Sequence, residues 1–65
     1  MEGQENWFIG KRLGVDVGED TIIDAYDCIF SRIIRPGDFV TMDLISCRVN
    51  IYVDESYIIH RIDVG

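Results

Sequence analysis

The stretch RVNIYV, residues 48–53, alternates regularly between apolar and polar or amphipathic side chains. The apolar positions are Val49, Ile51 and Val53, and the alternating positions between them are Arg48, Asn50 and Tyr52. Successive side chains of a strand point to opposite faces, and β-branched residues fit such a surface well. The stretch therefore predicts a strand with one fully apolar face.

Two further strands are predicted on either side of this one. FSRII, residues 30–34, is rich in β-branched side chains and is stopped by Pro36 and Gly37. On the other side, the turn-like DESY at 54–57 leads into IIHRIDV at 58–64. So short a connection favours an antiparallel hairpin between 48–53 and 58–64.

A short amphipathic helix is predicted over about residues 19–28. Its apolar side carries Ile22, Ile23, Ala25, Tyr26 and Ile29. The acidic residues of this region are Asp16, Glu19, Asp20, Asp24 and Asp27. They lack the spacing of a calcium-binding loop and are interpreted as a solvated helix face. Glu19 and Asp20 are suited to the positive N-terminal end of the helix. RLGVDVG, residues 12–18, predicts a turn or a frayed helix start.

The whole chain, residues 1–65, is expected to form one domain that contains a single short helix and three strands. Residues 1–18 are expected to form an irregular arm, with Trp7 closing one end of the core. A domain of this length buries only roughly 60% of the surface of its unfolded chain. Hydrophobic residues make up 48% of the sequence, which favours a compact fold over disorder.

Composition also limits the partners. A net charge of −6 argues against nucleic acid as a ligand. No apolar run approaches the roughly 20 residues of a membrane span, and the first ten residues lack the layout of a signal peptide. A cytoplasmic protein or a mature secreted form is therefore expected.

No catalytic, metal or cofactor site is predicted. The single histidine, His60, alternates with Ile58 and Ile62 on a predicted strand, which favours a structural histidine or one at the rim of the core. Cys28 and Cys47 have no metal-like spacing; they could pair in an oxidising compartment, but free thiols are the favoured interpretation. The chain is predicted not to be an enzyme.

The segment between the first two strands, residues 35–47, is the candidate binding loop. Pro36 and Gly37 predict a defined turn at its start. The run that follows, and the predicted contact region, comprises Phe39, Val40, Thr41, Met42, Asp43, Leu44 and Ile45. An exposed apolar run of this kind marks a binding site, and the alternative is a buried strand containing Phe39, Val40 and Leu44.

Arg48 and Asn50 are predicted to support this loop. They share one face of their strand and stand about 6 to 7 Å apart along it. Their donors are placed to reach the side chains of Thr41 and Asp43, on either side of Met42. Such bonds would hold the loop extended, as a peptidase active site binds its substrate.

These features resemble the potato inhibitor I family of serine protease inhibitors and the related small elastase-inhibitor family of bacteria and fungi. The positions that match the microbial family are Arg32, Ile33, Ile34, Pro36, Gly37, Asp38, Val40, Thr41, Met42, Arg48, Val49, Asn50 and Ile51. A looser likeness to potato inhibitor I covers Trp7, Ile9, Gly10, Lys11, Val64 and Gly65. The specific likeness spans about residues 30–54.

The resemblance implies a monomeric inhibitor with an α+β fold, in which a single helix packs on a small mixed sheet. The first two strands would run parallel, and the long exposed loop between them would enter the peptidase like a substrate. Met42 would be the primary specificity residue, with the scissile bond between Met42 and Asp43. The implied partners are subtilisin-like, chymotrypsin-like or elastase-like serine proteases.

The chain also departs from both families. Residues 12–28 follow neither helix segment, the terminal cysteine pair of the microbial family is missing, and Cys47 has no family role. A second interpretation of the same scaffold is a non-inhibitory interaction module that uses the exposed loop or adds a strand at a sheet edge.

Overall fold

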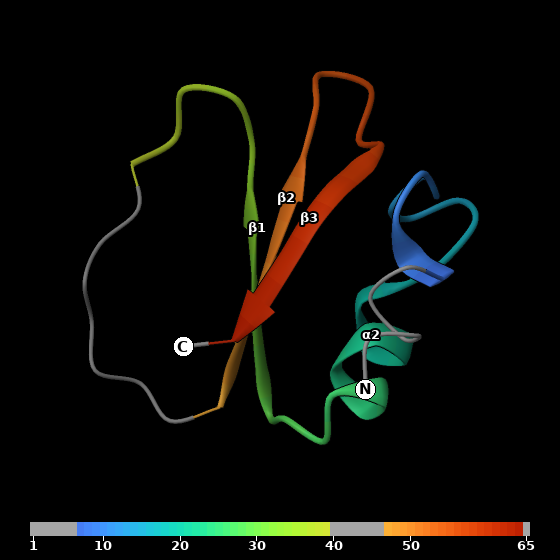
Figure 1. Ribbon diagram of the computed structural model, residues 1–65, viewed down its shortest axis with the longest axis vertical. Coiled ribbons are helices and arrows are strands. Elements are labelled where there is room, and N and C mark those ends of the chain that lie inside the picture. The colour runs from blue at the N-terminus through green and yellow to red at the C-terminus, as the bar shows by residue number, and fades with distance from the viewer. Residues whose placement is uncertain (1–6, 40–46, 65) are drawn as a thin grey trace.

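The computed structural model describes residues 7–39 and 47–64. Its elements are helix α2 (Glu19–Ala25) and strands β1 (Phe30–Ile34), β2 (Arg48–Val53) and β3 (Ile59–Val64). The sheet has the order β1-β2-β3, and helix α2 lies to one side of it (Figure 1). This arrangement confirms the predicted α+β class, a helix on a small mixed sheet.

The predicted strands and their directions are confirmed. β1 and β2 match the predicted ranges and run parallel, with Phe30 opposite Arg48 and Ile34 opposite Tyr52. β2 and β3 form the predicted antiparallel hairpin, with a register shift between Tyr52 and Val53. β3 begins one residue later than predicted, at Ile59.

The core lies between the sheet and the segments packed on one of its faces. Its buried cluster consists of Phe8, Leu13, Val17, Ile22, Val49, Ile51, Val53, Ile59 and Ile62. The apolar face of β2, predicted from the alternation alone, is its centre, because all three of its side chains are at most 1% exposed. Helix α2 contributes Ile22.

Helix α2 ends earlier than the predicted residue 28, and a specific turn ends it. The N–H of Asp27 donates to the carbonyl of Asp24 (3.1 Å), and that of Cys28 to the carbonyl of Ile23 (3.0 Å). Asp27 has a positive φ of 55°. These are the two bonds and the left-handed residue of a Schellman motif, which here carries aspartate where glycine is usual.

At the N-terminal end, the prediction that Trp7 closes the core is wrong. Phe8 enters the core at 4% exposure, whereas Trp7 remains 58% exposed. Trp7 packs edge-on against Phe8, and the Lys11 ammonium lies over its ring. The physical reason is that phenylalanine has no polar group to satisfy, while a buried indole N–H needs a partner.

The turn predicted at residues 12–18 contributes more than a connection. Leu13 and Val17 form an isolated bridge, and both are buried in the core. The N–H of Leu13 donates to the carbonyl of Tyr57, and Ile59 donates to the carbonyl of Lys11. This segment therefore pairs along the start of β3 and covers part of an otherwise open sheet edge.

Candidate functional site

The connection between β1 and β2 begins in a tight turn at residues 35–38. The N–H of Asp38 donates to the carbonyl of Arg35 (3.0 Å), and Gly37 has a φ of 87°. Proline at the second position and a positive φ at the third define a type II turn. The predicted turn is thus confirmed, and Gly37 occupies the position where a side chain would be strained.

The carboxylate of Asp38 forms additional hydrogen bonds across this turn. One of its oxygens accepts from the backbone N–H of Arg35 at 3.0 Å and from the Nε of Arg35 at 3.3 Å. The backbone hydrogen bond, followed by the side-chain bond and the charge of Arg35, lowers the pKa of Asp38 below its ordinary 3.8. Contact with Tyr57, then with Asp38, raises the pKa of the Arg35 guanidinium.

The hairpin turn between β2 and β3 lies beside this turn, at the same end of the sheet (Figure 1). The carboxylate of Asp54 accepts from the N–H groups of Ser56 (2.8 Å) and Ile58 (2.9 Å). The bond from Ile58, followed by that from Ser56, lowers the pKa of Asp54. A shallow hollow between the two turns is lined by Arg35, Pro36, Asp38, Asp54, Glu55 and Tyr57.

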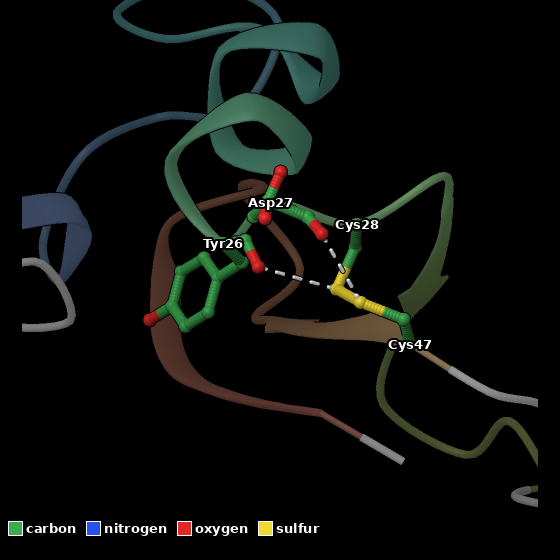
Figure 2. Close-up of a disulfide and its surroundings, with 4 residues drawn as sticks. All are labelled: Tyr26, Asp27, Cys28 and Cys47. Atoms are coloured by element: carbon green, nitrogen blue, oxygen red, sulfur yellow. Dashed lines mark hydrogen bonds between the residues drawn. A yellow bond between two sulfur atoms is a disulfide. The ribbon is translucent and has the colours of Figure 1, made fainter.

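At its other end the connection is held covalently. Cys28 and Cys47 form a disulfide with their Cα atoms 5.1 Å apart (Figure 2). The interpretation of these residues as free thiols is therefore wrong. The parallel register explains why, because pairing Phe30 with Arg48 brings the residues just before each strand together, and sequence spacing alone does not reveal that register.

Backbone carbonyl oxygens lie beside both sulfur atoms of the disulfide. The Sγ of Cys28 lies 3.5 Å from the carbonyl oxygen of Tyr26, and the Sγ of Cys47 lies 3.3 Å from that of Asp27 (Figure 2). Cys47 itself has a φ of 54°, a left-handed conformation that side chains rarely adopt. The helix end and the start of β2 therefore meet in a constrained junction.

Arg48 and Asn50 lie on the sheet face opposite the apolar face of β2. Both are buried, at 6% exposure each. The register aligns Arg32, Asn50 and Asp63 in one row across the three strands. Within that row the Nδ2 of Asn50 donates to the Oδ1 of Asp63 at 2.9 Å.

Asp63 and Arg32 are the residues of this polar row that the sequence analysis did not assign to the site. Asp63 also forms an ion pair with Arg61 (3.2 Å). The signal that could have found Asp63 is the hairpin register, since it places Asp63 opposite Asn50.

The remaining site predictions divide into one residue that the structure describes and six that it does not. Phe39 is 95% exposed, which contradicts its place in a buried strand and agrees with its place on an exposed loop. Val40, Thr41, Met42, Asp43, Leu44 and Ile45 lie outside the described residues. Their roles, and the predicted bonds from Arg48 and Asn50 to Thr41 and Asp43, stay predictions.

Other predicted features are placed away from this connection. His60 is exposed on β3, and its ring lies 6.5 Å from that of Tyr52. Within residues 7–39 and 47–64, no three His, Cys, Asp or Glu side chains cluster in a way that could hold a metal ion. No helix in the same described ranges is long and apolar enough to span a membrane.

Comparison with known proteins identifies the family. The family model of the peptidase inhibitor I78 family matches residues 6–65, which includes every helix and strand described above. No curated protein and no solved structure matches. The match names a small peptidase inhibitor family other than potato inhibitor I, so the expected activity is confirmed at the level of peptidase inhibition. The chain belongs to the peptidase inhibitor I78 family and is an inhibitor of a peptidase, not an enzyme.

Proposed function

We propose that the target is a serine peptidase and that the connection 35–47 enters its active site like a substrate, as in potato inhibitor I. In this proposal the bond between Met42 and Asp43 lies at the catalytic serine. The observation that carries it is the way the connection is anchored. A type II turn and a disulfide fix its two ends at opposite ends of the parallel strand pair.

The length of the connection supports a displayed loop. β1 has five residues, so the ends of the connection are separated by roughly 16 Å along the sheet. Thirteen residues, 35–47, join these ends, and an extended chain of that length reaches about 45 Å. The chain thus has more than twice the length needed to return to the start of β2, and the excess is available to a partner.

The polar row supports the proposed bracing of the loop. Arg48 and Asn50 are both buried on the sheet face away from the core cluster, where hydrogen bonds to a charged group are shielded from water. We assign Thr41 and Asp43 as the acceptors that Arg48 and Asn50 hold, with Asp63 fixing the Asn50 amide from the other side. A hydrogen bond to a charged group contributes roughly 1.5 to 3 kcal/mol when it is shielded from water.

Met42 sets the class of peptidase in this proposal. Its side chain is unbranched, apolar and flexible, so it fits a broad apolar pocket. Subtilisin-like, chymotrypsin-like and elastase-like enzymes are therefore favoured over trypsin-like enzymes, whose pocket requires a cation. The exposed Phe39, three residues earlier, is available for a further apolar contact on the same enzyme.

The experiment is a titration of subtilisin, chymotrypsin and pancreatic elastase with the intact protein, together with its Met42→Lys variant against trypsin. Stoichiometric inhibition of at least one of the three is expected, with trypsin inhibition gained by the variant. Met42→Leu serves as the matched control, because it keeps an apolar side chain of similar size and retains the original targets. If no serine peptidase responds to either the parent or the lysine variant, the serine-directed mechanism is wrong.

A further inference from the structure

The disulfide closes a ring that contains the proposed scissile bond. Cys28 and Cys47 are 19 residues apart, and the ring between them includes all of β1 and the connection up to residue 46. Hydrolysis of any peptide bond within this ring adds one water and opens the chain, but it releases no fragment. This consequence follows from the covalent connectivity alone.

The N-terminal side of the ring is attached to a fixed point. The Schellman bonds hold Cys28 at the end of α2, and α2 is anchored in the core by the fully buried Ile22. The hydroxyl of Ser31 on β1 also donates to the carboxylate of Glu19 on α2 at 2.8 Å. The helix end and β1 therefore move as one unit, and the disulfide adds Cys47 to it.

The C-terminal side of the ring is short. A cut between Met42 and Asp43 leaves the new amino group only four residues from Cys47. Four residues reach at most about 14 Å, so the disulfide keeps the amine within that distance of Cys47 and on the same covalent chain as the carboxylate from which it was separated. Confinement of this kind replaces a bimolecular encounter with an effectively intramolecular one.

We propose that the Cys28–Cys47 disulfide is a positioning pair that retains the two cleaved ends and thereby makes the chain an inhibitor instead of a substrate. The proposal deepens the proposed function and rests on it. Peptidase-catalysed hydrolysis converts the Met42–Asp43 bond and one water into a carboxylate and an amine. Resynthesis in the same active site releases that water, and the disulfide keeps both reactants present.

The test compares the parent protein with the double variant Cys28→Ser/Cys47→Ser. Serine suits both positions because the carbonyl oxygens of Tyr26 and Asp27 already lie beside the two sulfur atoms and can accept from hydroxyls. Leu13→Ala is the matched control, because it weakens the buried core from outside the ring. Each protein is incubated with subtilisin, and intact and cleaved chains are followed by mass spectrometry without reductant.

The parent is expected to reach a steady mixture of intact protein and a single species heavier by one water. The double variant is expected to raise the ratio of cleaved to intact chain by about tenfold or more, since its fragments can separate. Leu13→Ala is expected to keep the parent ratio, because general destabilisation does not release the ends. Equal ratios in the parent and the double variant would overturn the proposal while leaving inhibition in place.

A second readout separates this proposal from the proposed function. Each protein is cut once within the ring, if necessary by a peptidase that it does not inhibit, and the thermal melting of the cleaved form is recorded. The cleaved parent is expected to melt cooperatively, and the cleaved double variant to have lost its transition. If the cleaved parent is as unfolded as the cleaved double variant, the Cys28–Cys47 disulfide does not hold the cleaved ends. This conclusion would stand whatever the outcome of the inhibition assay.

Discussion

The two ends of the connection 35–47 are held by different kinds of interaction. At the first end, Arg35 and Asp38 close an exposed turn through hydrogen bonds and one ion pair. At the second end, a disulfide joins Cys47 to the end of α2. An exposed ion pair contributes little to stability because water screens it, whereas a disulfide contributes roughly 2 to 4 kcal/mol. The loop is therefore anchored firmly where β2 begins and more weakly where β1 ends.

Breaking the covalent end is expected to have the largest effect on stability. For a ring of this size the chain-entropy model gives about 3 kcal/mol, so Cys28→Ser/Cys47→Ser should lower the free energy of unfolding by about that amount. Urea denaturation of the parent and the double variant measures the difference. Intact-mass analysis after alkylation, with and without reductant, is the control: two alkylated cysteines before reduction would show that no disulfide stabilises the chain.

At the first end of the connection, in the turn at residues 35–38, Gly37→Ala is expected to have the next largest effect on the free energy of unfolding. Its φ of 87° penalises an L side chain by about 1 to 2 kcal/mol. An added Cβ would meet nothing within 4 Å, so the loss arises from the backbone alone. A synthetic chain with D-alanine at position 37 tests this reason, since D-alanine favours positive φ. Equal stability of the two alanine isomers in thermal melts would contradict the turn geometry.

Asp27→Gly is expected to raise the free energy of unfolding, because it strengthens the helix end that carries the disulfide. Asp27 is exposed and has a φ of 55° at the end of α2, where glycine suits the Schellman motif better. Relief of the backbone penalty exceeds the added entropy of the unfolded chain, so a gain of about 0.5 kcal/mol is expected. Asp27→Ala keeps the left-handed position without that relief and should not be stabilised. The test compares the urea unfolding midpoint of each variant with that of the parent.

The smallest expected effect is the pH dependence of the turn end. Because the pKa of Asp38 is lowered by folding, its contribution is present above the unfolded value of 3.8 and is lost as the pH falls through the lower folded value. Asp38→Ala should therefore have a slightly lower free energy of unfolding than the parent at neutral pH. The difference between the two proteins should become smaller in acid. Asp54→Ala, on the neighbouring hairpin turn, should show the same pH dependence of stability, because the pKa of Asp54 is also lowered. A gap that widens in acid would contradict this linkage.

The sequence predicts the features that depend on local pattern. The alternation in RVNIYV and the β-branched run FSRII identify β2 and β1 within their observed bounds, and Pro36 with Gly37 identifies the turn. Peptidase inhibition was likewise expected from residues near the loop, and the family match confirms it.

The features that the sequence did not predict depend on contacts between distant segments. The disulfide requires the parallel register that places Cys47 near the end of α2, and no spacing rule contains that register. Phe8 replaces Trp7 in the core because the choice between two adjacent aromatic rings depends on which one can leave its polar group in water. Asp63 joins the polar row only through the hairpin pairing.

If residues 35–47 occupy a serine peptidase as a substrate does, the peptidase cuts one bond within them, and the position of that cut tests the proposed binding mode. After incubation with a stoichiometric amount of subtilisin, the acid-quenched mixture is reduced and the fragments are weighed by mass spectrometry. Two fragments, residues 1–42 and 43–65, are expected from a single cut between Met42 and Asp43. A complex that inhibits fully while the only cuts fall outside residues 35–47 would contradict it.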